Sequence, residues 1–156
     1  LAGYLTEILG NDTWENLTRT KLLQPLNMMN TTFLEEPSQT IADNIAKPYV
    51  LKNGQLINST KSLYRIHPSE PAGAILSNAE DMAKWMRFLL QGGRDHLGRQ
   101  VVKEKLLNET FVTYNHLSGG IEEEYNLRKP TFPVNEMQVG YGYGWLTGSY
   151  RGNKYL

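Results

Sequence analysis

Residues 77–91 constrain the fold more than any other part of the chain, because they combine the features of an amphipathic helix. Ser77 and Glu80 match the Ser-x-x-Glu capping box, and Gly92 with Gly93 predicts where the helix ends. The apolar residues at helical spacing are Met82, Trp85, Met86, Leu89 and Leu90. They predict one buried face, so this helix needs a surface to pack against.

Two shorter helices are expected before this segment. Residues 1–9 carry apolar side chains at helical spacing, and Gly10 is suited to the position just outside the helix end. Asp12 or Thr13 can cap a second helix, which Pro25 stops. The first part of the chain is therefore expected to be mainly helical.

Strands are expected in three stretches. Asn53 and Gly54 separate two apolar runs, and this dipeptide favours the type I′ turn of a β-hairpin. Residues 31–34 predict a short strand. From residue 139 onward Gly alternates with Tyr and Trp, a pattern typical of a strand or a strand pair.

The remaining segments complete an α+β fold. Residues 58–71 and 118–136 predict loops, whereas residues 101–111 predict a last short helix. We find no internal repeat and no sign of a domain boundary. Both chain ends fall inside expected elements, so we expect one partial domain over residues 1–156, truncated at both ends.

The composition limits the classes of function. The chain has 156 residues, enough for one domain with a core, and its formal net charge is zero. No excess of charge draws it to nucleic acid or to an anionic membrane, and no apolar run approaches the ~20 residues of a membrane span. The absence of cysteine excludes disulfides, thiolate catalysis and cysteine-ligated zinc.

Glycosylation sequons point to a compartment. The pattern Asn-x-Ser/Thr occurs at Asn11, Asn16, Asn30, Asn58 and Asn108. Chance placement would give roughly 1.6 such patterns in a chain of this composition. The excess favours a eukaryotic glycoprotein of the secretory pathway or the extracellular space. Turns and helix caps rich in Asn and Thr are the alternative interpretation.

The chain carries no complete set of serine-hydrolase residues. A serine nucleophile needs a base, such as a Lys one helical turn later, but none of the seven serines has Lys three residues on. The nearest match joins Thr18 to Lys21 and has Thr in place of Ser. No Tyr-x-Asn and no Gly-x-Ser-x-Gly occurs either. We therefore identify no catalytic residue.

Other candidate residues favour structural roles. His96-Leu97-Gly98 matches His-x-Gly, but it follows a helix in a polar stretch, so we interpret it as a turn. The neighbouring Glu80 and Asp81 suit the positive end of a helix better than acid–base catalysis. The three histidines are far apart and predict no metal site, and no Gly-rich phosphate loop is present.

Three segments carry a resemblance to a known family. They are Gly-Tyr-Leu-Thr-Glu-Ile-Leu at 3–9 leading to Leu-Gln-Pro-Leu-Asn-Met at 23–28, Pro-Ala-Gly-Ala-Ile-Leu-Ser-Asn-Ala-Glu-Asp-Met-Ala-Lys-Trp at 71–85, and Val-Gly-Tyr-Gly-Tyr-Gly-Trp at 139–145. In this order the chain resembles the β-lactamase-related family, which includes class C β-lactamases, penicillin-binding proteins and their animal relatives.

The resemblance implies a β-lactamase/transpeptidase-like fold, of which this chain would hold mainly the helical subdomain, a β-hairpin and the start of the sheet. It implies a serine hydrolase or peptidase that forms an acyl-enzyme on a small molecule or peptide without cofactor or metal. In that family Ser-x-x-Lys lies upstream of such a stretch and a Lys/His-x-Gly strand lies downstream, so this chain alone would be inactive.

The resemblance also implies one candidate site. In the family an Ala/Gly-rich turn approaches the substrate cleft, and Ala72, Gly73 and Ala74 match that turn. Trp145 matches a family position that we expect to pack as core. The alternative function is a non-catalytic secreted binding module, either a pseudoenzyme or a glycan-binding protein that uses the Tyr, Trp and Gly residues near the C-terminus. The sequence leaves the oligomeric state open.

Overall fold

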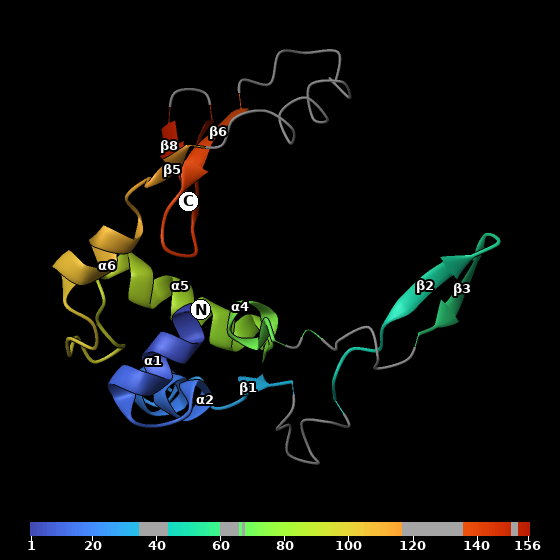
Figure 1. Ribbon diagram of the computed structural model, residues 1–156, viewed down its shortest axis with the longest axis horizontal. Coiled ribbons are helices and arrows are strands. Elements are labelled where there is room, and N and C mark those ends of the chain that lie inside the picture. The colour runs from blue at the N-terminus through green and yellow to red at the C-terminus, as the bar shows by residue number, and fades with distance from the viewer. Residues whose placement is uncertain (35–43, 60–65, 67, 117–135, 151–152) are drawn as a thin grey trace. The chain divides into compact units, whose positions relative to one another are not determined.

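The structure of the chain is a computed structural model that describes residues 1–34, 44–59, 66, 68–116, 136–150 and 153–156 (Figure 1). These residues form two compact units, Leu1–Val101 and Val102–Leu156. Nothing in the composition or in the spacing of the motifs predicted this division. Helices and strands both occur, which confirms the predicted α+β class.

The first unit holds more helical than strand residues, and its N-terminal part is helical, as predicted. Its described elements are α1 (Ala2–Gly10), α2 (Trp14–Thr18), the π-helical η1 (Arg19–Leu23), β1 (Thr32–Phe33), β2 (Tyr49–Lys52), β3 (Gln55–Asn58), α4 (Glu70–Gly73), β4 (Ile75–Leu76) and α5 (Ala79–Leu90). Strand β1 pairs antiparallel with β4, and β2 pairs antiparallel with β3. The predicted strand at 31–34 is thus confirmed as an element that joins distant parts of the sequence.

The junction between α1 and α2 corrects one prediction. Gly10 lies inside α1, and Asn11 instead takes the left-handed conformation with a φ of 51°. A Cβ at position 10 would lie 2.3 Å from the Leu17 side chain, so Gly10 allows the two helices to approach closely. Asn can replace Gly at a left-handed cap because its short polar side chain tolerates this conformation.

The second helix begins as predicted and ends in a way that the sequence does not reveal. Thr13 caps α2, because its hydroxyl accepts a hydrogen bond from the Asn16 N–H at 3.2 Å. The chain then widens into η1, where the Gln24 N–H donates to the Arg19 carbonyl five residues back at 2.9 Å. The turn after Pro25 closes at Asn27, whose φ is 57°.

The core of the first unit is built around Phe33. Trp14 meets Phe33 edge-on with ring centroids 4.9 Å apart, and the Arg19 guanidinium lies 5.2 Å from the centroid of the same ring. The other buried apolar residues of this unit are Leu23, Leu26, Met28, Ala74 and Phe88. The contacts to Phe33 join α2, η1 and β1.

Helix α5 corrects the prediction of its N-cap and shows which of its faces is buried within this chain. Its N-cap is Asn78 and not Ser77, because the Asn78 side chain accepts a hydrogen bond from the Asp81 N–H at 2.9 Å. The apolar face, which we expect to be core in an intact parent protein, is not the buried face within this chain: Met86 is 53% exposed and Leu90 is 88% exposed. Met82 is also exposed, whereas Trp85 and Leu89 are half-buried.

The face of α5 that is buried carries a charge. Asp81 is 0% exposed and Phe88 is 1% exposed, and the seven-residue spacing places both on one side of the helix. Lys84 lies between them on the same side and pairs with Asp81. A hydrophobicity pattern cannot predict such a face, because it assigns charged residues to the solvent. The helix end at Gly92 and Gly93 is confirmed, with φ values of 61° and 83°.

The hairpin formed by β2 and β3 confirms the prediction from Asn-Gly. Asn53 and Gly54 have φ values of 52° and 77°, as a type I′ turn requires. Lys52 lies opposite Gln55, so the turn has two residues. Every residue of both strands is exposed.

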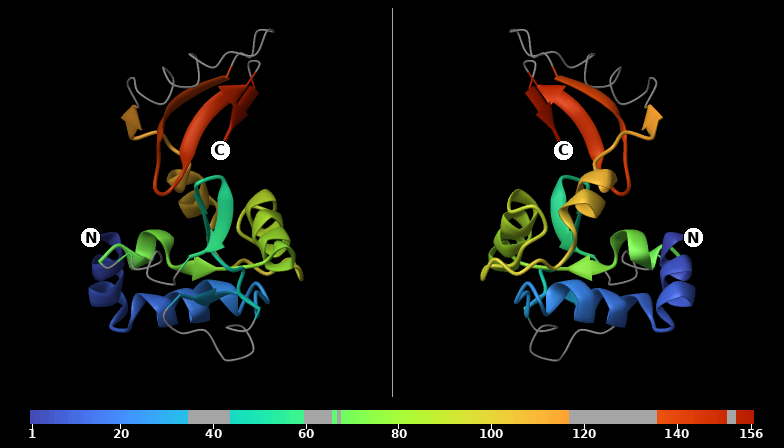
Figure 2. Two further views of the ribbon diagram at one scale, coloured as in Figure 1. Left: turned by 90° about the vertical axis from the view of Figure 1, so that its right-hand side faces the viewer. Right: turned by 90° about the vertical axis from the view of Figure 1, so that its left-hand side faces the viewer.

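The second unit combines one helix with a four-stranded sheet. Its described elements are α6 (Glu104–Thr110), β5 (Asn115–His116), β6 (Glu136–Tyr141), β7 (Leu146–Tyr150) and β8 (Asn153–Tyr155). The strands are antiparallel in the order β5-β6-β7-β8, and Figure 2 shows β6 and β7 as long neighbouring arrows in orange to red. The predicted helix at 101–111 and the strands after residue 139 are confirmed, although β6 begins three residues earlier.

Tight backbone contacts join α6 to the β6–β7 turn within this unit. A Cβ on Gly142 would lie 2.4 Å from the Thr110 carbonyl oxygen and 2.7 Å from that of Val112. Trp145 meets Phe111 edge-on with centroids 5.2 Å apart and is half-buried, so it packs at the margin of the unit rather than in a closed core. The predicted loop at 118–136 lies outside the described residues except for Glu136, which begins β6.

Candidate functional site

The residues that the sequence places at a substrate cleft lie around the end of α4. Ala72 and Gly73 belong to this short helix and are exposed, so the predicted turn is in fact a single helical turn. Ala74 follows and is buried: its N–H donates to the Glu70 carbonyl at 2.8 Å, and its carbonyl accepts from the Leu34 N–H at 2.8 Å. Ala74 is therefore fixed by its backbone hydrogen bonds, while Ala72 and Gly73 remain exposed at the surface.

A hydrogen-bonded chain of side chains begins directly after β4. The Ser77 Oγ lies 2.8 Å from the Thr31 Oγ1, and the Thr31 hydroxyl donates to the Asp81 carboxylate at 2.9 Å. The same carboxylate accepts from the Asn30 N–H at 2.9 Å and from the Lys84 Nζ at 2.8 Å. This network fixes the start of α5 against the turn that precedes β1.

The charges in this network are stable at neutral pH. Burial alone raises the pKa of the Asp81 carboxyl, but hydrogen bonds from Lys84, Thr31 and Asn30 outweigh burial and hold that pKa below 3.8. The hydrogen bond to Asp81 raises the pKa of Lys84 above 10.5. Asp81 is thus a permanent, enclosed carboxylate, which suits an anchor better than a proton acceptor.

Sequence reasoning assigned Asp81 only to helix-start electrostatics and missed its buried partners. The spacing to Lys84 and Phe88 was the available signal, because it aligns the carboxylate with a residue of the core. No sequence pattern indicated that Thr31 is a partner of Asp81.

The His-x-Gly match at residues 96–98 lies in a turn, as predicted. Asp95 is 2% exposed, and its carboxylate accepts from the Leu97 N–H at 2.9 Å and from the Arg99 N–H at 2.8 Å. The Arg99 Nε donates to its second oxygen at 2.7 Å. Burial raises the pKa of Asp95, but these bonds reverse the effect and lower it below 3.8. Gly98 has a φ of 80°, so the segment is a closed turn and not a strand that faces an acyl group.

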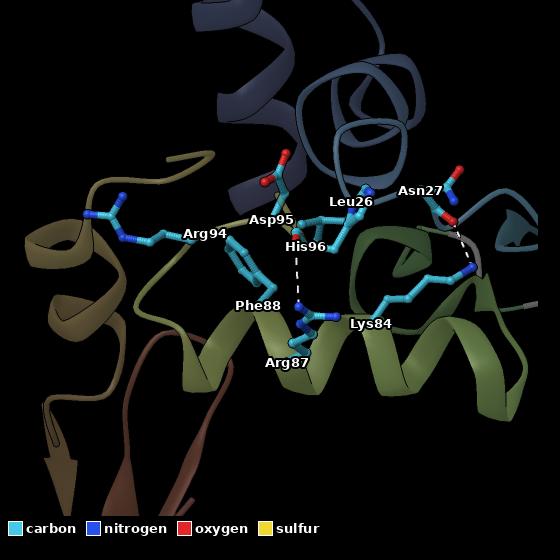
Figure 3. A pocket seen from close by; sticks show the side chains of 8 residues that line it. All are labelled: Leu26, Asn27, Lys84, Arg87, Phe88, Arg94, Asp95 and His96. Carbon is cyan, nitrogen blue, oxygen red and sulfur yellow. Dashed lines mark hydrogen bonds between the residues drawn. The ribbon is translucent and has the colours of Figure 1, made fainter. Parts of the chain in front are cut away.

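A cavity of about 230 Å³ opens beside this turn in the first unit. It is lined by Leu26, Asn27, Lys84, Arg87, Phe88, Arg94, Asp95 and His96 (Figure 3). Three segments contribute: the turn after η1, residues 84–88 of α5 and the segment after Gly93. Sequence reasoning did not predict this cavity, because its residues belong to three segments that only the fold brings together.

The second unit exposes a pair of tyrosines. The rings of Tyr114 and Tyr143 lie with centroids 4.8 Å apart, and they are 46% and 64% exposed. The Tyr114 hydroxyl donates to the Glu109 carboxylate. This bond and the neighbouring charge raise the pKa of Tyr114 to about 12.

The structure assembles no acyl-transfer site from the residues that it describes. The Thr18 hydroxyl, the nearest match to a nucleophile next to a Lys, donates to the Trp14 carbonyl at 2.7 Å. The Ser77 hydroxyl contacts Thr31, and within the described ranges no serine is hydrogen-bonded to a lysine. Nor do three His, Asp or Glu side chains gather as metal ligands in this part of the chain.

The sequon asparagines differ in accessibility. Asn11, Asn30, Asn58 and Asn108 are exposed. Asn16 lies in α2, is half-buried, and donates its side-chain amide to Asp12. Asn58 ends β3, and Asn108 lies within α6. No helix in the described part of the chain has the length and apolar character needed to cross a membrane.

Curated relatives support the resemblance. The chain is 30% identical to beta-lactamase-like protein 1 of Dictyostelium discoideum over 125 residues, which cover 69% of this chain and 19% of that protein. It is 33% identical to Gigasin-6 of Magallana gigas over 85 residues, which cover 54% of this chain and 28% of that protein. The aligned region is thus less than a third of either relative.

Solved structures share the fold. An octameric penicillin-binding protein homologue from Pyrococcus abyssi superposes with a TM-score of 0.66 at 19% identity, over 97% of this chain and 29% of its own. A D-amino acid amidase from Ochrobactrum anthropi SV3 superposes with a TM-score of 0.63 at 18% identity, over 98% of this chain and 40% of its own. These likenesses confirm the predicted β-lactamase/transpeptidase-like fold.

The match to the family model is the broadest finding. A model described as beta-lactamase matches residues 1–155. It includes all three segments from which the resemblance was first inferred, together with α4, the Asp81 network and the sheet of the second unit. The chain belongs to the beta-lactamase family.

Proposed function

We propose that this chain is one part of a longer serine hydrolase or peptidase-like protein that acts through an acyl-enzyme. One observation carries the proposal: a beta-lactamase family model matches residues 1–155, yet the chain contains no Ser-x-x-Lys. The small share of each relative that it covers, 19% and 28%, leaves room for the nucleophile and its base elsewhere. The intact protein would act on a small molecule or a peptide.

In this proposal the chain supplies scaffold and one wall of the cleft. The exposed Ala72 and Gly73 are small, so backbone and substrate can approach each other closely there. The hydrogen bonds of Ala74 hold the wall in place. The Asp81 network fixes α5, which starts five residues after the predicted wall ends.

The test of the chemistry uses an active-site probe on two proteins. The 156-residue chain and an intact protein that contains it are each treated with a fluorophosphonate and with a fluorescent penicillin. We expect labelling of the intact protein only, and its loss when the Ser of the Ser-x-x-Lys is changed to Ala. Labelling of the isolated chain, or an intact protein that stays unlabelled, would refute the proposal.

The test of the cleft wall uses a bulky substitution. Ala72→Trp in the intact protein should raise KM by obstructing the cleft while leaving the melting temperature nearly unchanged, because Ala72 is exposed. Ala46→Trp, at an exposed position outside the helices and strands, is the matched control. An equal effect of both variants on KM would remove Ala72 from the site.

We further propose that the protein passes through a eukaryotic secretory pathway. Asn58 should be the most readily modified sequon, because it ends an exposed hairpin strand, with Asn30 next. Asn16 should remain unmodified in folded material, since it is half-buried in a helix. Glycopeptide mapping after expression in a eukaryotic secretory host decides this, and secreted protein with an unmodified Asn58 would count against the proposal.

A second candidate function is that of a glycan-binding module without catalysis. The exposed, neighbouring rings of Tyr114 and Tyr143 favour it, because sugars stack on aromatic faces, and Glu109 lies beside them as a hydrogen-bond acceptor. An intact protein that binds oligosaccharides on an array and takes no active-site probe would support this function. Loss of array binding in Tyr143→Ala, but not in Tyr150→Ala, would locate it.

A further inference from the structure

The charged groups around the cavity in the first unit differ in how many of their hydrogen-bond donors or acceptors already have partners. Lys84 uses its ammonium group on the Asn27 carbonyl at 2.8 Å, on Asp81 at 2.8 Å and on Glu80 at 3.1 Å. These three acceptors match the three N–H donors of an ammonium group. The Asp95 carboxylate is likewise occupied by Arg99 and by two backbone N–H groups. Neither group is left to bind a ligand.

Arg87 is different. Its guanidinium makes one long hydrogen bond, from Nη2 to the His96 carbonyl at 3.4 Å, although a guanidinium has five donors. Across the described ranges, no carboxylate forms an ion pair with it. Figure 3 shows Arg87 rising from α5 toward His96, whereas Arg94 extends away from these residues. Arg94 also has a partner of its own, the Gly98 carbonyl at 3.1 Å.

The floor of the cavity is apolar. Leu26 and Phe88 line it, and both are buried, at 3% and 1% exposure. An apolar surface beside a cation with unused donors favours a ligand that has both an apolar part and an anionic part. A guanidinium matches the planar geometry of a carboxylate with two parallel hydrogen bonds. A phosphate ion would leave the apolar floor unused.

We propose that this cavity binds a small carboxylate with an apolar body, and that Arg87 anchors the carboxylate while Leu26 and Phe88 contact the body. The Asn27 side chain at the rim can orient the ligand. The site needs none of the residues assigned to the cleft wall, so it is independent of the acyl-enzyme proposal.

The test is a calorimetric and saturation-transfer NMR titration of the 156-residue chain with phenylacetate, benzyl alcohol and inorganic phosphate. We expect phenylacetate to bind and the other two to bind at least about tenfold more weakly, because benzyl alcohol lacks the carboxylate and phosphate lacks the apolar body. Arg87→Gln should weaken phenylacetate at least about tenfold, and Arg87→Lys less, since it keeps the charge but loses the planar pair of donors. Lys105→Gln, at an exposed position on α6 that does not line the cavity, makes the same change in net charge and should bind as the unaltered chain does.

Several results would overturn the proposal. They are the absence of phenylacetate binding, an equal loss in Arg87→Gln and Lys105→Gln, or equal binding of benzyl alcohol or phosphate. Arg87 is exposed, so its replacement should leave the fold intact, and circular dichroism of each variant checks this. An Arg87→Gln variant with an unchanged spectrum and unchanged binding would also refute Arg87 as the anchor.

Discussion

The Asp81 network makes a quantitative prediction about stability. Asp81→Asn keeps the shape of the side chain but removes its charge and turns one acceptor into a donor that faces the Lys84 ammonium. One amide oxygen must then serve Asn30 and Thr31, and the contact to Lys84 becomes repulsive. The first turn of α5 should loosen from the turn that precedes β1.

The expected cost follows from the partners. A hydrogen bond to a charged group contributes about 1.5–3 kcal/mol, and breaking a buried ion pair costs about 3–5 kcal/mol. Lys84 keeps two other acceptors, Asn27 and Glu80, which limits the loss. We therefore expect a destabilisation of about 2–3 kcal/mol, a substantial part of a typical total of ~5–15 kcal/mol.

The assay is urea unfolding followed by tryptophan fluorescence and circular dichroism. Glu80→Gln is the matched control, since Glu80 is adjacent, pairs with the same Lys84, and has a 74% exposed side chain. The control should lose under about 0.5 kcal/mol, as surface ion pairs do. Equal effects of Asp81→Asn and Glu80→Gln would refute the anchoring role of Asp81.

The same variant has a predicted pH dependence. The pKa of Asp81 is lowered in the folded chain, so its contribution is present above the unfolded value of 3.8 and is lost as pH falls through the folded pKa. The unaltered chain should therefore lose more stability on acidification below about pH 4 than Asp81→Asn does. The pKa of Asp95 is also lowered, but Asp95 is present in both proteins, so its contribution to the pH dependence of stability cancels from the comparison.

Three further predictions follow from other parts of the structure. Gly142→Ala should destabilise the second unit by about 1–3 kcal/mol, because the new Cβ would meet two backbone carbonyls, and an unchanged urea midpoint would contradict this. Tyr114 has its pKa raised to about 12, so its contribution to stability is full below pH 10 and is lost as pH rises toward 12; Glu109→Gln should shift phenolate absorbance at 295 nm to lower pH, and superimposable titrations would contradict it. Met86→Glu should change the stability of the 156-residue chain by under about 0.5 kcal/mol, since Met86 is 53% exposed, but should cost more in the proposed intact protein; equal costs in both would show that nothing covers this residue there.

Local chemistry explains which elements could be predicted. The Asn53-Gly54 turn, the helix end at Gly92 and the turn around Gly98 all require positive φ values that few residues adopt, so the sequence states them directly. The Thr13 cap is equally local, because the donor to its hydroxyl, the Asn16 N–H, lies in the first turn of the same helix. Pairing of β1 with β4 was not predictable in this way, since it joins residues more than forty positions apart.

Two of the errors share one physical cause, which is competition between equally suitable neighbours. Ser77 and Asn78 can each cap a helix, and Gly10 and Asn11 can each end one. Tertiary contacts decide: Thr31 engages Ser77, and Leu17 fills the space beside Gly10. A sequence read alone shows that a cap is present but not which candidate supplies it.

The two faces of α5 connect the fold to the proposed function. Amphipathic pattern alone predicts that Met82, Met86 and Leu90 are buried, yet the described residues of this chain leave them exposed and bury Asp81 and Phe88 instead. Exposed apolar side chains that recur every four residues on one helix are unusual for a surface that faces only water.

A helix with both an apolar face and a face anchored by polar contacts suits the interior of a larger protein. The family match supports this interpretation, because the aligned region is less than a third of each curated relative. The Asp81 face then belongs to contacts made within this chain, and we propose that the face of Met82, Met86 and Leu90 is contacted by other parts of a longer protein.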